Sequence, residues 1–161
     1  MENVLGYIYS WFESLYGYNL GNYLWGLDCN NQYTNPTLFN NIGIVALLIS
    51  IGVAVVYYFV INSPKLVSWW QWLIVLFIDG LINFVVGFSW MMNDLKTGKI
   101  PDCFVYSAQD GAQLIDSVNC IGFGMVNFII SASLFFIISF VIKRFSRNLS
   151  NTPFVSLFPK K

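Results

Sequence analysis

The sequence predicts an all-α integral membrane protein with three transmembrane helices, at about residues 42–61, 69–92 and 121–142. Hydrophobic residues make up 57% of the 161 residues and charged residues only 10%, whereas a soluble domain carries about 25% charged residues. Each predicted helix is long enough to cross the hydrocarbon core of a bilayer, which is about 30 Å thick. Asp79 is the one charged residue inside these three stretches. The length fits a single membrane domain, residues 1–161, without a separate soluble domain.

Residues 3–16 have apolar side chains at helical spacing and predict an amphipathic helix. Its apolar side contains Val4, Leu5, Ile8, Trp11, Phe12, Leu15 and Tyr16, and its polar side contains Gly6, Ser10, Glu13 and Ser14. Three placements are open: along the membrane interface, packed on the rest of the domain, or as the start of a fourth span over 4–27. The turn-rich residues 17–41 predict a loop.

The charges predict how the chain crosses the membrane. Six basic and no acidic residues fall in the 62–68 turn and after the third span: Lys65, Lys143, Arg144, Arg147, Lys160 and Lys161. Seven of the eight acidic residues fall in segments 1–41 and 93–119. By the positive-inside rule, the C-terminus is cytoplasmic, and segments 1–41 and 93–119 are not. We expect a plasma or inner membrane.

The predicted units follow from this topology. A non-cytoplasmic segment (1–41) comes first and is followed by a helical hairpin (42–92). Next comes an outer loop (93–119), which is expected to contain a short helix near 108–118. The third span and the basic residues that end it follow (120–147). Residues 148–161 form a cytoplasmic tail. We expect anchoring at the membrane surfaces by aromatic and basic side chains, namely Trp11, Trp69, Trp70, Trp72, Lys143, Arg144 and Arg147.

A stripe of polar and small residues marks one side of the second and third predicted helices. It consists of Asp79, Gly80, Asn83 and Gly87 on the second helix and of Gly124, Asn127 and Ser131 on the third. At 1.5 Å per residue the two stripes reach similar depths, so we expect them to meet or to line one cavity. Ala46, Ser50 and Ala54, four residues apart, predict a close-packing face on the first helix.

Asp79 is the candidate functional residue within this stripe. An ionised group at that depth costs at least about 2.5–3.5 kcal/mol, and the three predicted spans contain no basic residue to pair with it. Three interpretations remain open. The stripe joins helices through hydrogen bonds with Asp79 protonated, it forms an ion or proton path, or it contacts another membrane protein.

All three cysteines, Cys29, Cys103 and Cys120, fall on the predicted non-cytoplasmic side. In an oxidising compartment one disulfide can form, and its three pairings are open, as is the unpaired state. The sequence contains no CxxC pair and no histidine, so neither a thiol-exchange enzyme nor a zinc site is expected.

The absence of histidine removes the commonest general base, and no phosphate-binding, dinucleotide-binding or hydrolase motif occurs. The sequence therefore predicts a non-enzymatic protein with no cofactor, no metal site and no nucleic-acid partner. Its expected partners are the bilayer and other membrane subunits, identical or different. We expect a subunit, or an assembly or immunity-type component, of a membrane complex. The alternative is an oligomeric ion or proton channel, or a pore-forming effector, that uses Asp79 and Asn83.

Overall fold

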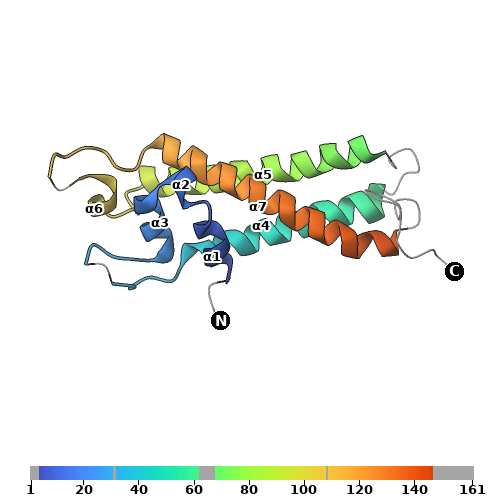
Figure 1. Cartoon of the computed structure of the whole chain (residues 1–161), viewed down its shortest axis with the longest axis horizontal. Coiled ribbons are helices and arrows are strands. Elements are labelled where there is room, and N and C mark those ends of the chain that lie inside the picture. Colours follow the sequence, from blue (N-terminus) through green and yellow to red (C-terminus); the bar gives the residue numbers. More distant parts are fainter. Residues whose placement is uncertain (1–3, 31, 62–67, 108, 147–161) are drawn as a thin grey trace.

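The structure is a computed structural model that describes residues 4–30, 32–61, 68–107 and 109–146. Three long helices lie side by side: α4 (Leu38–Val55), α5 (Trp69–Lys96) and α7 (Ser117–Ile142) (Figure 1). A π-helix, η1 (Val56–Ile61), continues α4, and a 3₁₀ turn, η3 (Lys143–Phe145), continues α7. The described residues form helices and isolated β-bridges but no strand. α4, α5 and α7, with their short continuations, are long and apolar enough to cross a membrane. The structure thus confirms the predicted helical class and the predicted number of candidate spans.

The long helices extend further than predicted at one end of the bundle. α4 starts at Leu38, directly after the extended residue Thr37, and α5 continues to Lys96. α7 starts at Ser117 because the Asp116 side chain accepts hydrogen bonds from the backbone N–H groups of Val118 and Asn119. Such a cap satisfies N–H groups that the first helical turn leaves unpaired. A hydropathy pattern does not include these polar ends, and at α7 the Asp116 cap marks where the helix begins.

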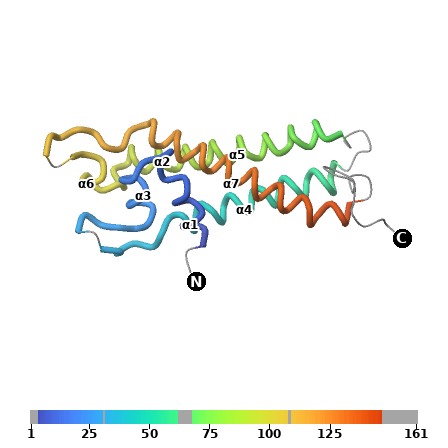
Figure 2. Tube along the Cα trace, in the orientation of Figure 1, coloured from blue at the N-terminus to red at the C-terminus, as the bar shows by residue number. Residues whose placement is uncertain are grey.

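Four short helices gather beside this same end and, with the loops that join them, form what we call the cap: α1 (Val4–Ser10), α2 (Glu13–Tyr16), α3 (Tyr18–Trp25) and α6 (Asp102–Val105) (Figure 2). The chain enters α3 through Gly17, whose φ of 87° is in the left-handed region. Glycine adopts this conformation without the steric cost that other residues meet.

The cap corrects four sequence-based expectations. The single helix over 3–16 is wrong, because the chain turns between Ser10 and Glu13. The fourth span over 4–27 is wrong as well, because that stretch forms three helices of at most eight residues. The loop over 17–41 contains α3 and the start of α4. The short helix expected near 108–118 is replaced by α6, further upstream, although residue 108 lies outside the described residues.

The buried side of the N-terminal segment also differs from the predicted apolar face. Gly6, Tyr9 and Tyr16 are buried, whereas Trp11 is 79% exposed. The buried side is selected by tertiary contacts. Tyr9 packs between the rings of Phe39 and Phe123, at centroid distances of 5.3 and 5.6 Å.

Close helix contacts occur where small residues were predicted to allow them. A Cβ atom on Gly80 would lie 2.6 Å from the Phe128 ring, and one on Gly124 would lie 3.0 Å from the Phe84 ring. The side chain of Asn127 occupies the space in front of Gly87. The α4 face of small residues, Ala46, Ser50 and Ala54, is buried. These contacts bring α5 and α7 together, with α4 packed against both.

Two predicted surface anchors are instead buried at the end of the bundle opposite the cap. Trp72 is 2% exposed, and its indole N–H donates to Ser139 Oγ at 3.3 Å. Lys143 is 7% exposed, with its Nζ 4.7 Å from the centre of the Phe140 ring. Trp11, Trp69, Trp70 and Arg144 are exposed, and Arg147 lies outside the described residues. A helical side chain faces its neighbours or the surroundings according to the rotation of the helix, and residue type alone does not set that rotation.

Candidate functional site: a polar cluster in the bundle core

Six polar side chains meet in the interior of the bundle, and none of them has measurable exposure. We call this set the polar cluster: Tyr9 from α1, Ser50 from α4, Asp79 and Asn83 from α5, and Asn127 and Ser131 from α7. Every helix that encloses the cluster contributes at least one of these groups. Because buried polar groups are costly unless hydrogen-bonded, their bonds constrain how the helices pack.

The first level of the cluster centres on Asp79. The Ser50 hydroxyl is 3.0 Å from Asp79 Oδ2 and 3.5 Å from the backbone oxygen of Ser131, within donating distance of both. The Ser131 hydroxyl donates to the backbone oxygen of Phe128 at 3.0 Å, within its own helix. Ser50 therefore joins α4 to both α5 and α7 at this level.

The second level lies one helical turn closer to the cap. Asn83 Nδ2 donates to the backbone oxygen of Asp79 at 3.1 Å, and Asn127 Nδ2 donates to the backbone oxygen of Asn83 at 3.3 Å. Tyr9 completes this level by donating its hydroxyl to Asn127 Oδ1. Burial raises the pKa of Tyr9, and the neighbouring Tyr16 raises it further, so the phenol is neutral and available as a donor near neutral pH.

Two oxygen atoms of the cluster are left without a partner among the described residues. They are Asp79 Oδ1 and Asn83 Oδ1, and both are buried. Asp79 also forms no ion pair with any residue that the structure describes. Buried polar atoms are nearly always hydrogen-bonded, so each exception requires a physical explanation. These two atoms are the chemically distinctive feature of the cluster.

The structure brings together the four polar residues among the seven that the sequence placed in the stripes. Asp79 and Asn83 face Asn127 and Ser131, at the matched depths expected from counting residues along each helix. Sequence reasoning assigned Ser50 only a packing role and missed its bond to Asp79. It also missed Tyr9, which lies 118 residues from Asn127 in the chain. The small-residue spacing was the available signal for Ser50, and the sequence contained none for Tyr9.

A second buried acid, Asp94, holds the cap to the end of α5. Lys99 Nζ lies 3.1 Å from Asp94 Oδ1, and the Tyr23 hydroxyl donates to Asp94 Oδ2 at 3.2 Å. Burial raises the pKa of Tyr23, and the negative charge of Asp94 and this hydrogen bond raise it further. The paired Asp94 thus has a structural role in the cap, in contrast to Asp79.

The cap contains a disulfide between Cys29 and Cys103, which are 74 residues apart in the chain. It joins the loop after α3 to α6, with 5.9 Å between the two Cα atoms. Of the pairings that the sequence left open, this is the one in the structure, and Cys120 is a buried free thiol. Among the described residues, no cluster of three histidine, cysteine or acidic side chains is suited to hold a metal ion.

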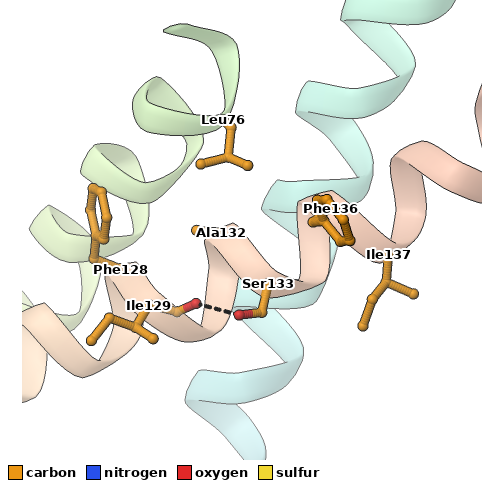
Figure 3. Close-up of a pocket in the computed structure, with 7 residues that line it drawn as sticks. All are labelled: Leu76, Phe128, Ile129, Ala132, Ser133, Phe136 and Ile137. Carbon is orange, nitrogen blue, oxygen red and sulfur yellow. Dashed lines mark hydrogen bonds between the residues drawn. The ribbon is translucent and has the colours of Figure 1, made fainter. Parts of the chain in front are cut away.

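An open groove runs outside the bundle between α5 and α7, with a volume of about 460 Å³ (Figure 3). Its lining is almost entirely apolar and includes Leu76, Phe128 and Phe136. Its polar member, Ser133, donates to the backbone oxygen of Ile129 at 2.9 Å and is satisfied within its own helix. The groove could therefore accommodate an apolar neighbour, but its lining provides no free polar group to bind or activate a substrate.

Replacing Tyr9 with phenylalanine tests how strongly the cap is tied to the polar cluster. The change removes the donor to Asn127 Oδ1 and leaves that oxygen unpaired in the core. We expect the free energy of unfolding to fall by about 1 kcal/mol or more, measured by thermal unfolding in detergent. Tyr7→Phe is the matched control because Tyr7 is exposed. Equal losses in the two variants would contradict the assignment.

The fold and the site together define an all-helical protein with three candidate membrane-crossing helices, a disulfide-linked cap and an occluded polar cluster. Comparison with protein-family models, with curated proteins and with solved structures finds no match to the chain.

Proposed function

We propose that this chain is an integral membrane protein whose three long helices cross the bilayer, with the cap outside the cytoplasm and the C-terminus inside. The long helices expose large apolar side chains around the bundle, such as Leu48, Ile74 and Val141, which lipid tails would cover. The basic residues after the third span support the orientation. A disulfide in the cap also fits an oxidising, non-cytoplasmic compartment.

We propose further that the protein is a non-enzymatic component of a membrane complex. The observation that carries this proposal is the enclosure of the polar cluster inside a single chain. A pore formed by several copies needs polar side chains along a shared water-filled path, whereas here Asp79 and Asn83 face the chain's own α4 and α7. The cluster thus supports a packed three-helix unit and counts against the channel alternative. Among the described residues, the Ser50 hydroxyl lies 3.0 Å from the Asp79 carboxylate, but both side chains are fully buried, so the pair is not placed to meet a substrate.

The cap supplies the surface through which we propose that the protein contacts another membrane subunit. Several of its aromatic side chains are exposed, among them Tyr7, Trp11, Tyr18, Tyr33 and Tyr106. Tyrosine and tryptophan are enriched in protein interfaces because they bury a large area and retain a polar group. Subunits of the same or of a different kind, including assembly or immunity partners, fit this surface.

Ion flux and native mass together test the proposal. We expect purified protein in sealed liposomes to give no ion flux across pH 5–8, both as wild type and as Asp79→Asn. We expect protein extracted from its native membrane in mild detergent to migrate as a larger assembly than the purified chain. Flux that Asp79→Asn abolishes would overturn the proposal in favour of a channel. A single monomeric species in both samples would overturn the proposal that the protein is part of a complex.

A further inference from the structure

Asp79 and Asn83 place two unpaired acceptor oxygens on one side of α5, one helical turn apart. An ionised Asp79 would keep its negative charge in the apolar core with one side-chain hydrogen bond, from Ser50, and with one oxygen bare. A buried charge without a partner is far more costly than a buried neutral group. A positively charged ligand at the Asp79 carboxylate would neutralise this charge and remove most of that cost.

The hydrogen bonding of the Ser50 hydroxyl indicates that this ligand is a proton. It has one hydrogen, yet it lies within donating distance of two acceptors, Asp79 Oδ2 and the backbone oxygen of Ser131. A proton on Asp79 Oδ2 resolves the conflict, because the acid then donates to Ser50 and Ser50 donates to Ser131. One proton thus orders a chain of hydrogen bonds from α5 through α4 to α7, and Asp79 Oδ1 becomes a neutral carbonyl oxygen.

Among the described residues, no basic side chain forms an ion pair with Asp79. Ser50 faces it from α4, and Ser50 in turn lies beside Ser131 on α7. The Phe128 ring of α7 packs against Gly80, the next residue along α5, and none of these three residues carries a charge. Tyr9, the other titratable member of the cluster, binds Asn127 as a neutral phenol. A hard metal cation such as Ca²⁺ takes about six or more oxygen ligands, and the described cluster leaves only two oxygens unpaired.

We infer that Asp79, together with Ser50, forms a proton-binding site in the bundle core, and that the bound proton holds α4 against α5 and α7. Loss of the proton leaves an anion in the core and draws water in, which loosens the contact of α4. The packing of the three helices is then sensitive to proton activity. This inference concerns the chain itself and does not depend on the proposed membrane complex.

Infrared difference spectroscopy on the full-length protein in detergent tests whether Asp79 is protonated. We expect wild type at pH 7 to show a carboxylic-acid C=O band that Asp79→Asn lacks and that Asp102→Asn, which alters an exposed acid, retains. Ser50→Ala is expected to shift this band without abolishing it, because the acid loses its hydrogen-bond acceptor but keeps its proton. That variant still tests the site if Asp79→Asn fails to fold.

The same spectra contain the outcomes that would overturn the inference. A carboxylate signal for Asp79 at pH 7 in the folded protein would show that Asp79 is ionised and that the site holds no proton. A signal that changes when sodium in the buffer is replaced by potassium or choline would show that a metal cation occupies the site. A band that is identical in wild type and Ser50→Ala would remove Ser50 from the site.

Stability against pH gives a second and independent readout. If the folded protein holds a proton that the unfolded chain releases, raising the pH must favour unfolding. We therefore expect the melting temperature of wild type to decrease between pH 6 and pH 9 relative to Asp79→Asn, which cannot titrate at this position. Parallel profiles for the two proteins would overturn the inference.

Discussion

Replacing Gly122 with leucine is expected to detach α2 from α7 and to lower the free energy of unfolding by about 3 kcal/mol. A Cβ atom at Gly122 would overlap the backbone oxygen of Leu15, and it would lie 2.8 Å from the Leu15 carbonyl carbon and 3.2 Å from Tyr16 Cα. These are backbone atoms, which cannot rotate away as a side chain does. The cap must therefore move, and the hydrogen bond from Asn119 Nδ2 to the backbone oxygen of Tyr16 would break.

Thermal unfolding in detergent and limited proteolysis of the N-terminal segment would measure this effect. Gly52→Leu is the matched control, because Gly52 lies on an exposed part of α4 and a Cβ there would meet nothing within 4 Å. We expect the control to unfold like wild type and its N-terminal segment to resist protease equally well. Similar losses at both glycines would show that α2 does not pack on α7 as closely as the structure indicates.

Breaking the disulfide is the second change with a large expected effect. Cys29→Ser or Cys103→Ser frees a loop of 74 residues, and the chain-entropy relation gives a loss of about 4 kcal/mol for a loop of that length. Either change is expected to separate the loop after α3 from α6 and to unfold the cap before the long helices. Thermal unfolding with and without reductant measures the loss, and the double variant should match each single one.

Cys120 provides the control for this experiment. It is buried and has no disulfide partner, so Cys120→Ser is expected to retain the bond and its sensitivity to reductant. Under denaturing, non-reducing conditions, wild type should accept one maleimide label, and three after reduction. Three labels without reduction, or a full loss of the reductant effect in Cys120→Ser, would contradict the pairing of Cys29 with Cys103.

Segments with a strong local signal were predicted well. Long apolar runs with at most one charged residue predict the three long helices, because few other structures share that composition. The depth of the polar stripes followed from the fixed rise of a helix, which placed Asn83 beside Asn127. The N-terminal segment was predicted poorly, because its aromatic residues fit several helical faces and its turns depend on contacts with α7.

The sequence by itself determined the helical class, the three candidate spans, the presence of an acid within the second, and the segregation of charge along the chain. Only the tertiary structure decided that Ser50 and Tyr9 complete the polar cluster, that Cys29 pairs with Cys103, and that Trp72 and Lys143 face inward. The reason is physical. Hydropathy and helical periodicity are properties of neighbouring residues, whereas these contacts join residues that only the packing of separate helices brings together.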